Sequence, residues 1–129
     1  LYTINPAGVL LNTVINNISG AINGIHLSAN NNRIAYCRDV SGFENANYRQ
    51  LDSRIFVYNF TTLVATEIPL DRPSGFNDLD VRFSPNEAEF IFVNTSNDGI
   101  SQRNIQKATV GILNSRVTLF SNATMPDWK

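Results

Sequence analysis

The chain has 129 residues, of which 43% are hydrophobic and 16% are charged, and this composition is typical of one folded globular domain. Its formal net charge of -1 gives no electrostatic reason to expect nucleic acid as a partner. No apolar run approaches the roughly 20 residues of a transmembrane helix, so we expect no membrane insertion.

Short segments in which apolar and polar residues alternate predict strands, because they are rich in β-branched and aromatic residues. Helix signals are nearly absent. The clearest strand segments are, in chain order, RIFVYNF (Arg54–Phe60), LVATEI (Leu63–Ile68), EFIFVN (Glu89–Asn94) and RVTLF (Arg116–Phe120). Longer connections are expected at Arg38–Ser53 and Pro69–Leu79. The sequence predicts an all-β fold of about ten strands in four-stranded antiparallel sheets.

The predicted core consists of large apolar residues within these strands. We expect the following side chains to be mostly buried: Leu27, Ile34, Tyr36, Ile55, Val57, Phe83, Phe90 and Phe92.

The chain also repeats itself, which favours a repeat architecture. The segment IHLSANNNRIAYC aligns without a gap on VRFSPNEAEFIFV, with Ser28 on Ser84, 56 residues later. In both copies a short turn containing serine separates two apolar runs, so the turn is expected to join the first two strands of a unit.

Two further matches extend the repeat. Trp128 takes the place of Phe83 at a third start, 45 residues later, and LYTINPAGVLLNTVI from Leu1 matches IFVYNFTTLVATEI from Ile55. ATVGILNSRVTLF, from Ala108, is a looser third copy of this second pattern. Each full unit then holds four strands, and about 45 residues per four-stranded unit is the size of a β-propeller blade.

At these residues the sequence resembles TolB-type β-propellers, whose blades open with an apolar-Ser-Pro-Asp-Gly element followed by an Ile-Ala-Phe-like strand. Phe83–Asn86 and the strand Phe90–Val93 carry the resemblance best. Pro126–Trp128 resembles the start of a following blade, and Leu1–Asn5 resembles the closing half of an earlier one. The segment NTSNDG (94–99) is similar to the Ser-Asp-x-x-Gly loop after the second strand.

The sequence departs from the family pattern in the turn. Glu87 and Asn31 stand where the turn glycine is expected, and Ala29 replaces the proline in the first copy. Asparagine tolerates left-handed geometry whereas glutamate does so poorly, so either the blades are divergent or the turn has another type.

The resemblance implies an incomplete propeller, with 1–24 as the end of one blade, 25–78 and 79–124 as full blades, and 125–129 as the start of the next. An immunoglobulin-like sandwich is the alternative fold, but it does not predict an ungapped internal repeat. Because known propellers have four to eight blades, we expect a longer parent protein or self-association through exposed blade edges. The start at Leu1, without methionine or signal peptide, agrees with a processed or trimmed piece.

Residues suited to catalysis are few. Cys37 is the only cysteine and His26 the only histidine, and both are expected to be structural. Two carboxylate pairs, Asp78 with Asp80 and Glu87 with Glu89, are spaced i, i+2; a strand would place each pair on one face, where it is expected to be solvated. We therefore predict a non-catalytic chain without cofactor or metal.

By resemblance, the chain is expected to be a protein-binding scaffold module of a cell-envelope TolB-like propeller, in the periplasm or otherwise outside the cytoplasm, with a protein or envelope component as partner. An accessory propeller domain of a larger hydrolase or a carbohydrate-binding propeller are the alternatives.

Binding is expected on the face of the propeller that carries the long connections, because recognition groups often lie on loops of a rigid scaffold. The candidate binding residues are aromatic, arginine and polar side chains of these connections: Arg38, Asp39, Phe43, Tyr48, Arg49, Asp52, Arg72, Phe76, Asn77 and Asp98. For Phe43 and Phe76, pinning of their own loops is an equal alternative.

We predict that alanine at Tyr48 or Arg49 weakens binding of a native partner by roughly 1–2 kcal/mol each, because aromatic and arginine side chains are the usual anchors of interfaces. Affinity measured after capture of the partner from envelope extract checks this. Substitutions in the FTT turn, Phe60–Thr62, are the control; loss of binding there with retention in the loop variants would place the interface on the other face.

Overall fold

A computed structural model of the chain describes residues 1–13, 20–42, 52–98 and 100–128, and this part contains ten strands and no helix. The strands are β1 (Tyr2–Ile4), β2 (Leu10–Thr13), β3 (Ile22–Leu27), β4 (Arg33–Asp39), β5 (Ser53–Asn59), β6 (Val64–Glu67), β7 (Phe76–Phe83), β8 (Glu89–Ser96), β9 (Asn104–Thr109) and β10 (Val117–Ser121). The predicted all-β class is confirmed.

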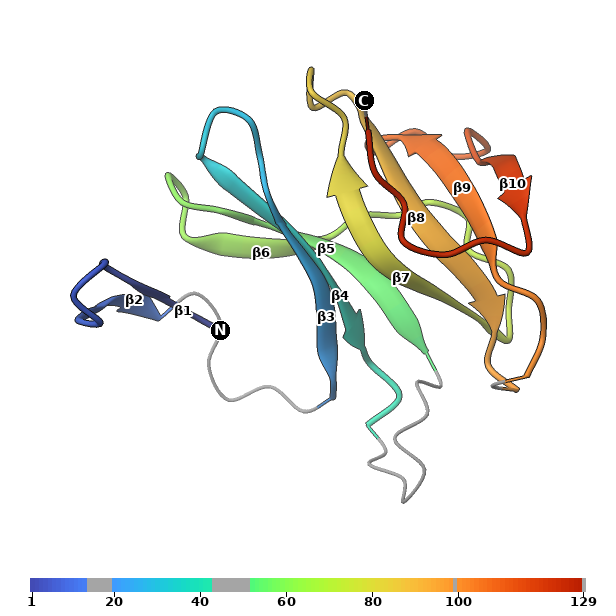
Figure 1. The fold of residues 1–129 in the computed structure, drawn as a ribbon, viewed down its shortest axis with the longest axis horizontal. Helices are drawn as coiled ribbons and strands as arrows, with labels where there is room; N and C mark the ends of the chain where they lie inside the picture. The colour runs from blue at the N-terminus through green and yellow to red at the C-terminus, as the bar shows by residue number, and fades with distance from the viewer. Residues whose placement is uncertain (14–19, 43–51, 99, 129) are drawn as a thin grey trace.

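These strands form three antiparallel sheets (Figure 1). β1 and β2 make a hairpin of their own. The first sheet has the order β3-β4-β5-β6 and the second the order β7-β8-β9-β10, so each strand pairs with its neighbour in sequence. The first sheet begins at Ile22 and the second at Phe76, slightly before the expected unit starts at residues 25 and 79.

The two four-stranded sheets contain the same irregularity, 56 residues apart. The pairing of β3 with β4 shifts register after Asn23, and the pairing of β7 with β8 shifts after Leu79. Within these bulges, Gly24 and Asp80 hold equivalent positions with positive φ angles of 58° and 50°. The sequence repeat is therefore also a repeat of backbone geometry.

The serine-containing turns also match in their hydrogen bonds. Ser28 Oγ accepts a hydrogen bond from the N–H of Arg33 at 3.0 Å, and Ser84 Oγ accepts one from the N–H of Glu89 at 2.9 Å. Each serine hydroxyl donates to the side-chain oxygen of the asparagine two residues later, at 2.9 and 2.7 Å. Both turns are thus closed by a buried serine that bonds across the loop.

Glu87, at the expected glycine position, has a φ of 58°, and Asn31 in the first turn has 57°. The left-handed region is unfavourable for glutamate by about 1 kcal/mol or more. Glu87 Oε1 accepts a hydrogen bond from the N–H of Asn30 at 2.9 Å, and Oε2 pairs with Arg33. The hydrogen bond from the Arg33 guanidinium lowers the pKa of the Glu87 carboxyl. The unexpected glutamate therefore ties the second turn to the first.

The hairpin β1–β2 repeats β5–β6, 54 residues later. Asn5 Oδ1 accepts hydrogen bonds from two backbone N–H groups of its turn, at 3.0 and 2.9 Å. Asn59 Oδ1 does the same at 2.7 and 3.2 Å. The match between these segments is thus a match between two asparagine-closed hairpins.

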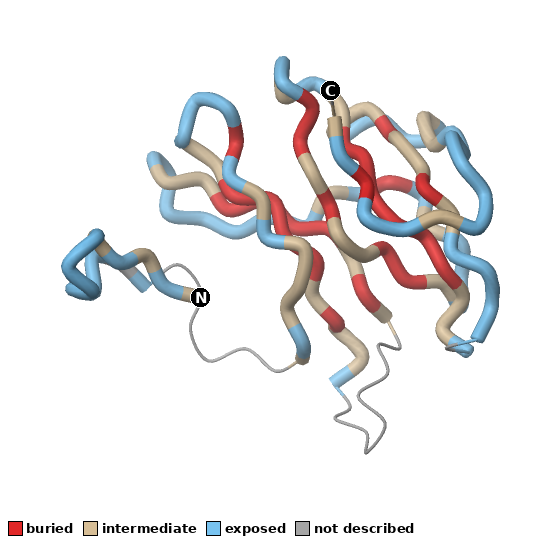
Figure 2. The backbone as a smooth tube through the Cα atoms, in the orientation of Figure 1, coloured by how far each residue is buried: buried red, intermediate tan, exposed pale blue. Residues whose placement is uncertain are grey.

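The main core lies between the two four-stranded sheets, where β7 packs across β3, β4 and β5. It contains buried residues of both sheets and Leu70 of the connection between β6 and β7: Ala35, Cys37, Ile55, Val57, Leu70, Val81, Phe83, Phe90, Phe92 and Ala108. A second cluster on the far face of the first sheet consists of Ile34, Tyr36, Phe56 and Tyr58. Buried residues concentrate in β4, β5, β7 and β8, whereas β6 and β10 are exposed throughout (Figure 2).

Seven of the eight predicted core residues are buried, and the prediction is wrong for Leu27, which is 47% exposed. Its equivalent Phe83 is 2% exposed because it packs against the first sheet. Leu27 pairs with Ile34 and so lies on the face of the first sheet that points away from the second. Equivalent positions in the repeat therefore meet different neighbours.

The segment after β10 turns back across the second sheet (Figure 1). Pro126 is buried, as is Val81 at the equivalent position, and Met125 shares the left-handed φ of Asp80, at 56° and 50°. No strand forms there up to Trp128, where the described residues end. The predicted third start thus shares backbone features with β7 without being part of a sheet.

His26 joins the first strands of the two sheets. Its Nδ1 accepts a hydrogen bond from the N–H of Phe83 at 3.1 Å, which requires this nitrogen to be unprotonated. Burial, and next the positive charge of Arg82, lower the pKa of His26, while Asp127 acts in the opposite sense. The histidine is structural, as expected.

We predict that Ser28→Ala and Ser84→Ala each lower the free energy of unfolding by about 1–2 kcal/mol, because each leaves a backbone N–H without its acceptor and removes one of the donors to an asparagine oxygen. Urea unfolding measures the change. Ser121→Ala, at an exposed strand position, is the matched control and should stay within about 0.5 kcal/mol of the parent chain.

We predict that stability falls as the pH drops from 7 toward 5. The pKa of His26 in the folded chain lies below its free value of 6.5. The stabilisation that His26 gives the fold is therefore complete above pH 6.5, and it is lost at lower pH, where protonation of Nδ1 displaces the Phe83 N–H. His26→Asn retains a side-chain acceptor but does not titrate in this range, so its stability should depend less on pH between 7 and 5. Equal pH dependence of both proteins would contradict this role.

Candidate functional site

The described parts of three connections lie at one end of the two four-stranded sheets. These are residues 40–42 and 52 between β4 and β5, 68–75 between β6 and β7, and 97–98 and 100–103 between β8 and β9. The N–H of Asn97 donates to the carbonyl of Gly75 at 2.8 Å, so the second and third connections are in contact. We call this end of the molecule the loop end.

Asp52 links the first two connections. It accepts hydrogen bonds from Arg54 Nε at 3.0 Å and Arg54 Nη2 at 2.8 Å, and it pairs with Arg72. The Arg54 hydrogen bonds, and next the charge of Arg72, lower the pKa of Asp52. Arg72 also donates to the carbonyl of Phe76. The structure thus brings Asp52 and Arg72 together as partners in an ion pair.

Two other predicted residues are buried. Asp39, 3% exposed, accepts hydrogen bonds from the N–H groups of Ser41 and Asp52 at 2.9 and 3.3 Å. Asn77, also 3% exposed, accepts one from the N–H of Ser53 at 2.8 Å. Both side chains shape the loop end from inside instead of presenting a contact group to a partner.

The remaining described candidates lie nearer the surface. Phe76 is half-buried at the start of β7, and the Arg38 guanidinium lies over the Phe56 ring at 5.7 Å. Asp98 closes its own turn by accepting from the N–H groups of Ile100 and Ser101 at 2.9 and 2.8 Å. These bonds, with that of the Ser101 hydroxyl first, lower the pKa of Asp98 to about 2.

Three predicted binding residues, Phe43, Tyr48 and Arg49, lie outside the described residues.

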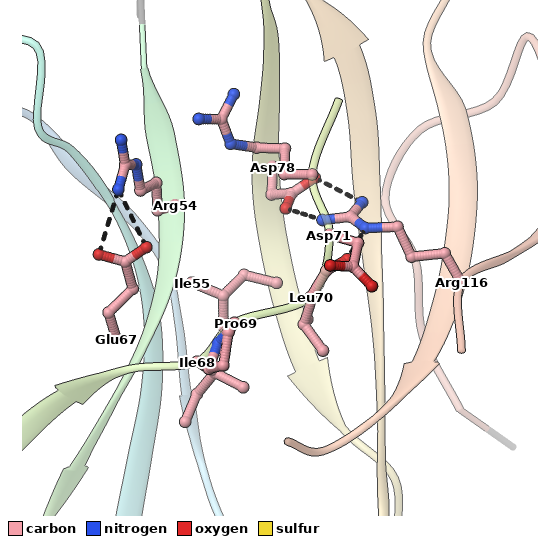
Figure 3. Close-up of a pocket in the computed structure, with 10 residues that line it drawn as sticks. Arg54, Ile55, Glu67, Ile68, Pro69, Leu70, Asp71, Asp78 and Arg116 are labelled. Carbon is pink, nitrogen blue, oxygen red and sulfur yellow. Dashed lines mark hydrogen bonds and ion pairs between the residues drawn. The ribbon is translucent and has the colours of Figure 1, made fainter. Parts of the chain in front are cut away.

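A cavity of about 300 Å³ opens between the two sheets beside the loop end (Figure 3). Figure 3 shows Arg54 and Glu67 on one side and Asp71, Asp78 and Arg116 on the other. Arg72 and four apolar residues complete the lining: Ile55, Ile68, Pro69 and Leu70.

One wall of this cavity is a buried ion pair. Arg116 Nη1 donates to Asp78 Oδ1 at 3.0 Å and to Gln106 Oε1 at 3.0 Å, and Nη2 also pairs with Asp78. Asn94 Nδ2 donates to Asp78 Oδ1 at 2.9 Å, and the guanidinium lies 4.9 Å from the centroid of Phe92. The pair fastens the start of β10 to the start of β7.

The expectation that Asp78 and Asp80 form a solvated pair on one face is therefore wrong. The bulge after Leu79 interrupts the alternation, and Asp78 is 2% exposed against Arg116. The other pair does not share a site, because Glu87 bonds the first turn while Glu89 accepts from Lys107 at 2.8 Å.

Sequence reasoning missed Arg54, Asp78 and Arg116 as members of one cavity, and the repeat holds no signal that would have joined them. Cys37 is fully buried and its pKa is raised by burial, as expected of a small core residue. Within the described residues, no group of three or more His, Cys, Asp or Glu is placed to hold a metal ion. The same residues include no helix with the length and apolarity to span a membrane.

No model of a known protein family matches the chain, and no curated protein matches it significantly. The resemblance to TolB-type propellers therefore depends on the residues of this chain alone.

We predict that Asp78→Ala lowers the free energy of unfolding by about 3 kcal/mol, because it leaves the mostly buried Arg116 without its carboxylate. Denaturant unfolding measures this. Glu89→Ala breaks the more exposed pair with Lys107 and is the control, with an expected loss below about 1 kcal/mol. Equal losses in both variants would show that the buried pair has no special weight.

Proposed function

We propose that the chain is a non-catalytic protein-binding scaffold built from blades of a TolB-like β-propeller that works outside the cytoplasm. The observation that carries this proposal is the equivalence of three successive segments of the repeat: β3, β7 and the segment after β10. Gly24, Asp80 and Met125 share a left-handed φ at the same position of the repeat. The residues directly after Asp80 and Met125, which are Val81 and Pro126, are both buried.

The strand order supports a propeller over an immunoglobulin-like sandwich. Each four-stranded sheet is a simple meander of consecutive strands. A sandwich of the immunoglobulin type instead distributes consecutive strands between its two sheets through Greek-key connections. Propeller blades are four-stranded sheets that repeat around an axis, and β7 packing on the face of the preceding sheet agrees with such a repetition.

The exposed apolar residues of β3 also support this proposal. Ile25 and Leu27 are 49% and 47% exposed. The equivalent Val81 and Phe83 are only 0% and 2% exposed, because the first sheet covers them. A further blade before β3 would cover Ile25 and Leu27 as the first sheet covers their equivalents. The proposal thus explains the one predicted core residue that is not buried.

The side chains best suited to covalent or acid–base chemistry have structural roles, which favours binding over catalysis. His26 Nδ1 is engaged by the N–H of Phe83, and Cys37 is buried in the main core. The hydrogen bonds and ion pairs among the described residues of the loop end favour it as the surface that a protein partner contacts.

A site-specific photo-crosslinking experiment tests the proposed binding face. The photo-reactive residue benzoylphenylalanine is introduced at one of two positions. One is Ile100, which is 91% exposed at the loop end, and the other is Leu63, which is 68% exposed in the turn at the opposite end of β5. We expect one discrete adduct in envelope extract from position 100 only, competed by excess unmodified chain. Adducts from position 63 alone would overturn the choice of face, and no competed adduct from either would contradict the binding function.

A further inference from the structure

We propose that the cavity between the two sheets binds a guanidinium or ammonium group carried on an aliphatic chain. The volume of about 300 Å³ lies at the small end of the roughly 300–1,000 Å³ of ligand pockets, so one long side chain or a small organic cation suits it better than a large ligand. The inference does not depend on closure of a propeller.

The hydrogen-bond donors of the cavity are largely engaged. All three nitrogens of Arg116 donate, to the carbonyl of Leu70 and to side-chain oxygens of neighbouring strands. All three nitrogens of Arg54 donate to Asp52 or Glu67. A ligand that needs several donors, such as a phosphate or carboxylate, would have to break these bonds.

Hydrogen-bond acceptors remain available on both sides. Among the described residues, only Arg54 donates to Glu67, through Nη1 at 3.1 and 3.3 Å, and the Glu67 side chain is 43% exposed. Asp71 accepts from the N–H of Asn114 through Oδ2, and no described residue donates to its Oδ1. Because a carboxylate offers about four lone-pair sites, both groups can accept further bonds from a cation.

The charge balance points the same way. Three arginines and three carboxylates line the cavity, so their formal charges cancel. Asp52, which pairs with Arg54 and Arg72 outside the lining, adds one further negative charge. An entering cation would compensate this excess, and the exposed Arg54–Glu67 pair is weak enough to rearrange around it.

The apolar lining suits the aliphatic part of such a ligand. Figure 3 places four apolar residues between the carboxylates of Glu67 and Asp71: Ile55, Ile68, Pro69 and Leu70. Of these, Ile55 and Leu70 are 1% and 4% exposed. Lysine and arginine side chains commonly lay their methylene groups along apolar surface while the charged head meets polar partners.

The test is a titration of the full 129-residue chain followed by the amide NMR signals of residues 68–72. N-acetyl-argininamide represents a protein side chain and agmatine a free small cation. N-acetyl-citrullinamide is the neutral isostere, and inorganic phosphate is the anionic probe. We expect saturable shifts from at least one cation, with the citrulline probe at least about fivefold weaker and no saturation by phosphate; the tighter of the two cations identifies the source.

The double variant Glu67→Gln/Asp71→Asn should weaken binding of the better cation at least about fivefold while its far-UV circular dichroism is unchanged. Glu89→Gln removes a carboxylate that is paired with Lys107 outside the cavity, and it should leave the affinity unchanged. The proposal would be overturned if no probe gave saturable shifts, if the citrulline probe bound as well as the cations, or if phosphate bound better than they do. Equal effects of the two variants would also overturn it. None of these outcomes would affect the crosslinking test of the loop end.

Discussion

The close approach of β7 to the first sheet is the constraint on which the other contacts of the structure depend. At the crossing, a Cβ atom on Gly24 would lie 2.5 Å from the Cα atom of Asp80, so only glycine allows the two bulges to meet. This contact places Val81 and Phe83 in the main core and brings the N–H of Phe83 to His26. The backbone of one unit is thus fitted to the backbone of the next, not only to its side chains.

The same crossing determines where the charged residues meet. With β7 held against the first sheet, its start lies beside β5 and the connection from β6, and Asp78 faces Arg116 across a buried pair. At the loop end, Asp52 joins Arg54 to Arg72. The arginines of this region therefore use their hydrogen-bond donors on carboxylates of the same chain. The groups that can still bond a ligand at the cavity are hydrogen-bond acceptors.

Much of the fold could be predicted from the sequence because its signals are local. Strand alternation, the serine turns and the ungapped repeat each depend on residues near one another in the chain, and the structure reproduces them. Leu27 could not be predicted, because its exposure depends on which sheet lies next to it. Glu87 looked unsuited to the turn because the bonds that compensate its left-handed φ come from the other turn.

The candidate site was less predictable for the same reason. Asp39 and Asn77 are in the connections that the sequence singled out, yet their side chains point inward and bond backbone N–H groups. The bulge after Leu79 changes the face of β7 on which Asp78 lies, and no strand pattern indicates Arg116 as its partner. Position along the chain identified the loop end, but it did not separate residues that build it from residues that present themselves to solvent.

The unequal spacing of the repeats, 56 and then 45 residues, has a consequence for how such a chain can change. The connection between β4 and β5 spans residues 40–52, and the equivalent connection between β8 and β9 spans only 97–103. Each doubling of a flexible loop adds only about 0.6 kcal/mol of closure entropy. Insertions at the loop end are therefore cheap, whereas one added residue within β3 or β7 would move the bulge that lets the sheets meet. The larger of the differences in connection length between the two sheets lies at the loop end, and there the chain can diversify without altering the packing that folds it.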